Sequence, residues 1–221
     1  MAESNAECNE GYEVIVLFDG YSKKTQEGLT ANCTCTLILG PKKIIVDTMT
    51  AWDGEKLVEA LKQRNIECDD INFVVCTHGH SDHIGCNYLF KKAMHIVGHC
   101  ISYRDVYFDH DFEKEEYVID GNVKVIATPG HTLEDVSVIV RTEEKGTIVI
   151  TGDLFENGDD LEDDRIWREL TCCSEELQLK NRNLILQLAN YIVPGHGPMF
   201  RNKKLKKCLK LNDSHHVNFI E

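Results

Sequence analysis

The sequence lacks the features that mark membrane proteins, secreted proteins and general nucleic-acid binders. No apolar run among its 221 residues is long enough to span a bilayer, and the polar, acidic stretch 1–10 resembles neither a secretory signal nor a transit peptide. Lys and Arg number 24 against 37 Asp and Glu, and the net charge of −13 argues against broad, nonspecific binding of nucleic acid. We therefore expect a cytosolic or nucleocytoplasmic protein that is not secreted and has no membrane partner.

Zinc-ribbon spacing is also missing. The chain has ten cysteines, but none are arranged as Cys-x-x-Cys, and the close pairs are Cys33 with Cys35 and Cys172 with Cys173. In a reducing compartment free thiols are expected rather than disulfides. Internal repeats and low-complexity runs are absent, so the length and a hydrophobic fraction of 42% fit one domain with a full core.

Apolar strand-like runs alternate with single helices along the chain, which predicts an α/β fold of two mixed sheets packed face to face with helices outside. The domain is expected over 12–210, after a disordered lead at 1–11 and before a flexible tail at 211–221. A hairpin is expected over 29–47. Helices are expected over 52–64, from Asp82 to about Lys92, and over 175–189, the last with Leu177, Leu184, Ile185 and Leu188 inward.

Two charged segments stand out. The stretch 156–164 carries six acids and is typical of a solvated loop. The stretch 201–210 carries six bases, with Leu205 and Leu209 spaced to pack as one helical stripe. Two interpretations stay open for the basic segment, an ordinary surface helix or a patch that faces the substrate.

The stretch richest in chemistry is Thr77–Gly85, which reads Thr-His-Gly-His-Ser-Asp-His-Ile-Gly. It follows an apolar run that predicts a buried strand. Alternate residues of an extended segment point the same way, so His78 and His80 share one face, while Asp82 and His83 lie at a helix start. This arrangement provides ligands for two adjacent metal ions: two imidazoles at one point, and a carboxylate with a third imidazole at a neighbouring point.

Three further motifs repeat one pattern, an apolar strand followed by a sharp turn and a side chain that can bind metal. They offer His131 and His196, each after Pro-Gly, and Asp153 after Gly152, because glycine lets the backbone turn tightly at the metal. Any one of these is a weak signal, since a histidine after Pro-Gly is more often a turn residue. Together with the first motif they complete a set of seven candidate ligands: His78, His80, Asp82, His83, His131, Asp153 and His196.

The His-x-His-x-Asp-His spacing is the signature of the metallo-β-lactamase superfamily, and the chain resembles that superfamily. The resemblance implies the four-layer αββα sandwich of this fold. It also implies that His78, His80 and His131 hold a first metal, that Asp82, His83 and His196 hold a second, and that Asp153 bridges them. With mostly imidazole ligands two zinc ions are the expected cofactors, although iron or manganese also fits the geometry.

The expected chemistry is hydrolysis by a hydroxide shared between the two metals. Asp82, which would orient the nucleophile, and the bridging Asp153 are the expected catalytic residues. Asp47 resembles the aspartate that orients a ligand in this superfamily. The alternative for Asp47 is a helix cap for the segment near Trp52.

Fold and metals do not fix the substrate, because the superfamily spans lactamases, thioesterases, lactonases, nucleases and flavodiiron oxidoreductases. Too few residues separate Asp153 from His196 for the inserted domain of the β-CASP nucleases. Too few follow His196 for the helical substrate domain of glyoxalase II.

The segments 127–138, 152–156 and 193–198 look like the compact animal family of metallo-β-lactamase domain-containing protein 1. That resemblance implies a homodimeric endoribonuclease that acts on histone pre-mRNA 3′ ends in the cytosol and nucleus. Arg201, Lys203 and Lys204 are then candidate phosphate contacts for an RNA partner. The main alternative is a small-molecule thioesterase or lactonase of glyoxalase II type, and the second is a metal-binding scaffold without turnover.

Overall fold

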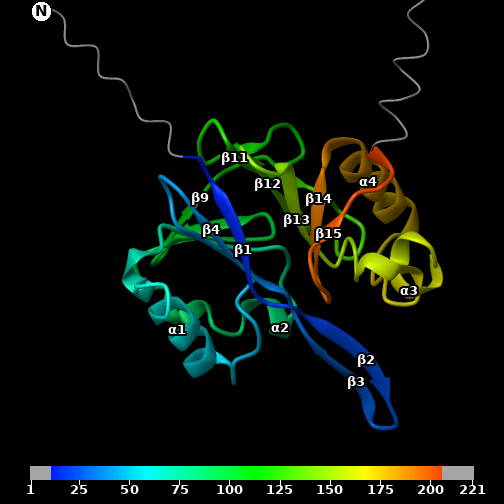
Figure 1. The fold of residues 1–221 in the computed structure, drawn as a ribbon, viewed down its shortest axis with the longest axis horizontal. Coiled ribbons are helices and arrows are strands. Elements are labelled where there is room, and N and C mark those ends of the chain that lie inside the picture. The colour runs from blue at the N-terminus through cyan, green and yellow to red at the C-terminus, as the bar shows by residue number, and fades with distance from the viewer. Residues whose placement is uncertain (1–10, 206–221) are drawn as a thin grey trace, which may run out of the picture.

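Two mixed β-sheets lie face to face in the computed structural model, which describes residues 11–205, and helices cover their outer sides (Figure 1). Within the described residues one sheet has seven strands in the order β1-β4-β5-β6-β7-β8-β9, and the other has six in the order β10 to β15. Strands β2 and β3 form a separate hairpin that projects from the body (Figure 1). The predicted αββα arrangement is confirmed.

The bounds of the elements are as follows. The first sheet consists of β1 (Glu13–Phe18), β4 (Cys35–Leu39), β5 (Ile44–Val46), β6 (Phe73–Cys76), β7 (Met94–Val97), β8 (Cys100–Tyr103) and β9 (Val106–Phe108). The second consists of β10 (Tyr117–Val118), β11 (Val123–Ala127), β12 (Val136–Thr142), β13 (Gly146–Gly152), β14 (Tyr191–Pro194) and β15 (Phe200–Arg201). The hairpin pairs β2 (Tyr21–Thr25) with β3 (Gly28–Asn32), and the α-helices are α1 (Gly54–Lys62), α2 (Ser81–Ile84), α3 (Arg165–Arg168) and α4 (Glu175–Leu188).

Alternating side chains of the strands build three apolar layers. Val75 of β6 belongs to the layer between the two sheets. Its neighbour Val74 faces the other way and packs in the cluster that includes Leu57 of α1. On the opposite outer side, Val149 of β13 packs in the cluster that includes Ile185 of α4. One helix on each outer face therefore completes the four layers.

The helix predicted from Asp82 to about Lys92 is wrong in length. Helix α2 ends at Ile84, and a single 3₁₀ turn over Asn87–Leu89 follows it. The Gly85 N–H donates to the Met49 carbonyl at 2.8 Å, and a Cβ at Gly85 would overlap the backbone of the 49–51 segment. The chain is therefore tied to the loop after β5 at the point where the helix would have continued.

The predicted inward face of the last helix is also partly wrong. Ile185 is buried as expected, but Leu184 and Leu188 are 41% and 42% exposed. The acidic stretch 156–164 is not a fully solvated loop, because Glu156 and Asp160 are 2% and 0% exposed. These two corrections share one cause: α4 buries polar side chains that hold the loop carrying Asp160.

Several segments were missed or fall beyond the described part of the chain. Neither the β2–β3 hairpin nor strands β8 and β9 were predicted from the sequence. Arg201 ends strand β15, so a surface helix, one of the two interpretations of 201–210, does not begin at Arg201. Residues 206–210 lie outside the described range, as do 1–10 and the predicted tail at 211–221. None of the helices within 11–205 is long and apolar enough to cross a membrane.

Candidate metal centre

The loops that carry the seven candidate ligands meet at one edge of the sandwich. Strand β5 is parallel to β6, and β13 is parallel to β14, so the carboxyl ends of each pair point the same way. The two sheets are joined at this edge, where the Val136 N–H donates to the Thr77 carbonyl at 2.9 Å. The four loops after β6, β11, β13 and β14 therefore converge although they come from both sheets.

Four of the seven side chains form what we call the first ligand group: His78, His80, His131 and Asp153. Nδ1 of His80 lies 2.8 Å from Nε2 of His78 and 3.1 Å from Nε2 of His131. Nε2 of His131 lies 3.4 Å from Oδ2 of Asp153. Three imidazoles and a carboxylate thus point their lone-pair atoms at one place.

The other three side chains form the second ligand group: Asp82, His83 and His196. Nε2 of His83 and Nε2 of His196 lie 3.8 and 3.9 Å from Oδ2 of Asp82. Asp153 lies between the two groups, with Oδ1 at 3.3 Å from His83 Nε2 and Oδ2 at 3.2 Å from His196 Nε2. The structure therefore brings all seven predicted residues together.

A buried hydrogen-bond network orients the imidazoles. Asp47, which is 1% exposed, accepts from the Thr77 N–H at 2.7 Å, from Thr77 Oγ1 at 3.0 Å and from His83 Nδ1 at 3.0 Å. Thr77 Oγ1 also lies 3.1 Å from Nδ1 of His78. With Nδ1 engaged in both rings, Nε2 keeps its lone pair toward the ligand groups. Asp47 is not a helix cap, since α1 begins only at Gly54.

His196 is oriented from the hairpin. Its Nδ1–H donates to the Asn32 carbonyl at 3.0 Å, at the end of β3, which again leaves Nε2 for the ligand groups. Nothing in the sequence marked Asn32 for this role, since a backbone acceptor can come from any residue type.

Charges within the centre move the pKa values of its histidines in opposite directions. Burial, together with the neighbouring His83 ring, holds the pKa of His78 well below its usual range. Burial alone would lower the pKa of His83, but the Asp153 and Asp47 charges raise it well above that range. Against burial, Asp153 likewise raises the pKa of His196 to about 9. Positive charge is therefore favoured beside Asp153, where a cation can take the place of these protons.

Five of the seven side chains are buried, which leaves two at the mouth. His80 is exposed and the Asp82 side chain is 18% exposed, whereas Asp153 is 5% and His78 1% exposed. A substrate that reaches the centre therefore meets His80 and Asp82 first.

A family model described as the metallo-beta-lactamase superfamily matches residues 30–196, which include every candidate ligand. The chain belongs to the metallo-β-lactamase superfamily. It is 40% identical over 194 residues to metallo-β-lactamase domain-containing protein 1 of Xenopus laevis, a match that covers 86% of this chain and 82% of that protein. The predicted resemblance to this family is confirmed.

Solved structures show the same metallo-β-lactamase fold. A Thermotoga maritima protein named after the metallo-β-lactamases matches with a TM-score of 0.64 at 24% identity, over 86% of this chain and 99% of that chain. A quorum-quenching N-acyl homoserine lactone lactonase matches with a TM-score of 0.60 at 21% identity, over 85% of this chain and 92% of that chain.

Membership in this superfamily, together with the His/Asp cluster, implies divalent metal cofactors. The side chains fit such ions. His83 Nε2 and Asp153 Oδ1 are buried atoms that have no hydrogen-bond partner within the described residues, and they face each other at the middle of the centre. Polar atoms are seldom left so in a folded protein, and a cation would satisfy both.

Two buried carboxyl groups near the metal centre, those of Asp135 and Glu156, were not predicted from the sequence to be part of its surroundings. Burial, reinforced by the Asp153 charge, raises the pKa of Glu156 to about 9. Burial also raises the pKa of Asp135 to about 7, although its hydrogen bonds from Thr132 act in the opposite direction. Both acids lie in the segments that carried the family likeness, yet neither stands at a recognised ligand position.

The predicted phosphate contacts lie away from the ligands. Arg201 pairs with Tyr191, the first residue of the strand that leads to His196. At about 3.3 Å per residue, this register places Arg201 about 10 Å along β14 from Pro194, where the strand ends before the turn that carries His196. Lys203 and Lys204 follow Arg201 and are exposed.

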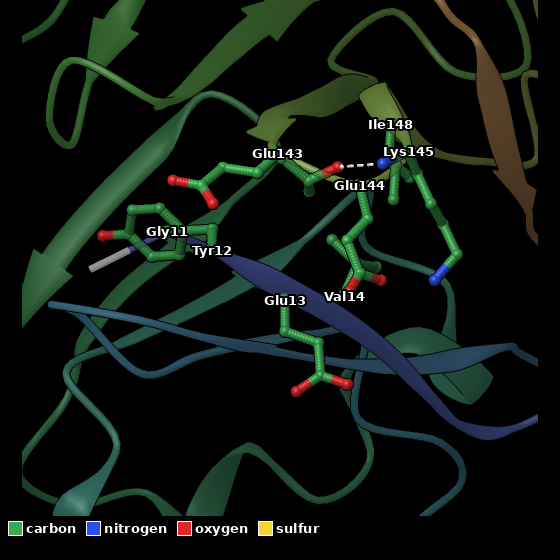
Figure 2. Close-up of a pocket in the computed structure, with 9 residues that line it drawn as sticks. Gly11, Tyr12, Glu13, Val14, Glu143, Glu144, Lys145 and Ile148 are labelled. Atoms are coloured by element: carbon green, nitrogen blue, oxygen red, sulfur yellow. Dashed lines mark hydrogen bonds between the residues drawn. The ribbon is translucent and has the colours of Figure 1, made fainter. Parts of the chain in front are cut away.

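A cavity of about 380 Å³ opens at the far end of β13 from Asp153, between the start of β1 and the turn from β12 to β13 (Figure 2). Figure 2 shows the Glu13, Glu143 and Glu144 side chains around it. Its position excludes it from the metal centre.

Proposed function

We propose that the protein is a dinuclear metal-dependent hydrolase, with the two ligand groups holding a pair of divalent cations and zinc as the expected ion. The observation that carries this proposal is the position of Asp153. Its Oδ1 lies 3.3 Å from His83 Nε2 of the second group, and its Oδ2 lies 3.4 Å from His131 Nε2 of the first group and 3.2 Å from His196 Nε2 of the second. One carboxylate directed at both groups is what a bridging ligand requires.

When bound, two such cations supply a nucleophile from water near neutral pH and stabilise negative charge on a substrate oxygen. The protein's own residues fix where this happens. Asp82 is the member of the second group that lies at the mouth, where its carboxylate can orient the attacking water. Asp47 and Thr77 hold the rings of His83 and His78, so the lone pairs stay directed inward.

For the substrate we propose an RNA phosphodiester, at histone pre-mRNA 3′ ends, as the sequence resemblance implies. What supports it is the likeness to the metallo-β-lactamase domain-containing protein 1 family over most of the chain. Exposed Arg201, Lys203 and Lys204 would then contact phosphates away from the cleaved bond rather than at it. The same proposal includes a homodimer located in the cytosol and nucleus.

A second candidate is hydrolysis of a small lactone or thioester. Two observations favour it: the net charge of −13, and the displacement of the predicted phosphate contacts along β14 and β15. The fold shared with an N-acyl homoserine lactone lactonase is compatible with this chemistry. A scaffold without turnover is disfavoured, since a full set of seven ligand-type side chains is present.

The test is a parallel hydrolysis assay of zinc-loaded protein on a histone pre-mRNA 3′ fragment, an N-acyl homoserine lactone and a glutathione thioester. Asp153→Ala serves as the inactive control. RNA cleavage that disappears in this variant supports the nuclease. Lactone or thioester turnover with intact RNA rejects it in favour of the second candidate, and full metal occupancy without any hydrolysis rejects both.

The RNA contacts have their own test. Replacing Arg201, Lys203 and Lys204 together by alanine should weaken RNA binding and lower the slope of log K against log salt by about 2, at roughly 0.7 per phosphate contact. A matched control replaces Lys62, Lys91 and Lys92, three exposed lysines on the first sheet's side of the molecule. Equal slopes in the two triple variants would remove these residues from the RNA site.

A further inference from the structure

Helix α4 buries a polar face and exposes an apolar one. Gln178, Asn181 and Arg182 are 0%, 8% and 4% exposed, whereas Leu184 and Leu188 are about two-fifths exposed. A surface helix ordinarily directs its apolar stripe at the core. Burying an amide or a guanidinium is unfavourable unless its donors are bonded, so the partners of this polar face explain its orientation.

Those partners are backbone carbonyls of two ligand loops. Gln178 Nε2 donates to the carbonyl of Asp153 at 3.0 Å, and Arg182 Nη1 donates to the carbonyl of Leu154 at 2.7 Å. Asn181 Nδ2 donates to the carbonyl of Pro129 at 2.6 Å, two residues before His131. One rigid helix thus holds both the loop of Asp153 and the loop of His131.

A buried ion pair between Arg182 and Asp160 also fixes the later part of the Asp153 loop to α4. Both Nη atoms of Arg182 donate to the carboxylate of Asp160 at 2.9 and 2.8 Å, and Asp160 accepts from the Glu156 N–H at 2.8 Å. The guanidinium also lies 4.1 Å from the ring centre of Phe155. Residues 153–160 are therefore folded around the Arg182 side chain.

Helix α4 also packs directly against the His131 loop. A Cβ at Gly130 would overlap the backbone of Gln178, so the two segments are in contact with no space between them. The Ser174 N–H, at the helix start, donates to the Gly130 carbonyl at 3.0 Å. After leaving their strands, these turns have no neighbouring strand to supply donors, and the polar face of α4 supplies them.

We propose that the polar face of α4 sets the spacing between His131 and Asp153, with Gln178 as the positioning residue that acts on the Asp153 backbone. This inference rests on the proposed dinuclear function, because the spacing matters through the metal pair. The Gln178 side chain contacts the backbone carbonyl of Asp153 and none of the metal-binding side-chain atoms of the two ligand groups. Its effect reaches the centre through the main chain of the bridging residue.

The experiment compares Gln178→Met with Gln187→Met. Methionine keeps the length of glutamine and removes its donor, and Gln187 lies on the exposed side of the same helix, so the chemical change is matched. Zinc affinity is measured by chelator competition, and the Co²⁺-loaded proteins are compared by their visible d–d spectra. We expect zinc binding weaker by about 10–100-fold and an altered Co²⁺ spectrum in Gln178→Met, with wild-type behaviour in Gln187→Met.

A purely structural role for Gln178 would lower the stability of the metal-free protein and leave affinity and spectrum unchanged, and that result would overturn the inference. Thr171→Val serves if Gln178→Met does not fold. Thr171 Oγ1 donates to Gln178 Oε1 at 2.8 Å, so this milder change disturbs the same amide and should give a smaller loss in the same direction. A wild-type protein that binds no metal would instead reject the proposed function itself.

Discussion

Replacing Asp47 by asparagine should weaken metal binding by the second ligand group about 10–100-fold, while the first group keeps most of its affinity. Oδ1 of Asp47 accepts from the Thr77 N–H, and Oδ2 accepts from Thr77 Oγ1 and His83 Nδ1. In the variant, the amide oxygen of Asn at position 47 still accepts from the Thr77 N–H. The amide NH₂ group then lies against His83 Nδ1. An NH₂ group only donates, so Nδ1 must accept and the ring proton moves to Nε2.

That shift of the proton removes the lone pair that a cation needs. Loss of such an orienting partner typically costs 10–100-fold in metal affinity, which corresponds to about 1.4–2.7 kcal/mol. Backbone strain adds little, because Asp47 has a φ of 58° and asparagine tolerates this left-handed conformation as well as aspartate does. The effect should therefore appear in metal binding rather than as a general loss of fold.

The assay is a zinc titration against a competing chelator, read as the number of metals bound per chain and the affinity of each. Asp120→Asn is the matched control: Asp120 accepts from the Tyr12 hydroxyl and from two backbone N–H groups, at the end of β11 remote from His131. A folded Asp47→Asn protein that binds two metals with wild-type affinity would refute the proposed orientation of His83.

Three further outcomes are expected. Gly195→Ala should weaken metal binding, because a Cβ there would overlap Asp153 Oδ1, whereas Gly121→Ala has nothing within 4 Å and should bind as the wild type does; equal affinities would contradict this. The raised pKa of Asp135, about 7, means that the folded protein holds a proton that the unfolded chain has released between about pH 4 and 7, so stability falls as the pH rises across that window. Between pH 5 and pH 8 the fall is up to about 3 kcal/mol and should vanish in Asp135→Asn, which urea unfolding at these two pH values would check; the same change with pH in both proteins would count against it. Chelation should lower the melting temperature, since each metal at 100 times its Kd contributes about 2.7 kcal/mol, and a melting curve that chelator leaves in place would argue that no tight metal was bound.

The candidate ligands could be predicted from sequence because each follows a strand end, and strand ends in this fold share an edge. The apolar runs before His78, His131, Asp153 and His196 show the strands, and the Gly-containing turns show where each strand stops. The position of Asp47 after β5 followed from the superfamily resemblance. Its contact with His83 needed the structure.

The orientation of α4 could not be predicted in the same way. The helical periodicity of apolar residues predicts that Leu184 and Leu188 face the core. In the structure both side chains are exposed. What decides the helix face is a set of unpaired carbonyls in distant turns, which no local pattern records. The acidic stretch around Asp160 was wrongly predicted to be solvated for the same reason. Asp160 is buried because its partner Arg182 lies on that helix.

The dinuclear centre is tested most directly by an anomalous-diffraction map of zinc-loaded crystals collected on both sides of the zinc absorption edge. We expect two zinc peaks about 3.5–4 Å apart, one among the first ligand group and one among the second, with the Asp153 carboxylate between them. A single peak, or zinc bound away from Asp153, would contradict the dinuclear centre.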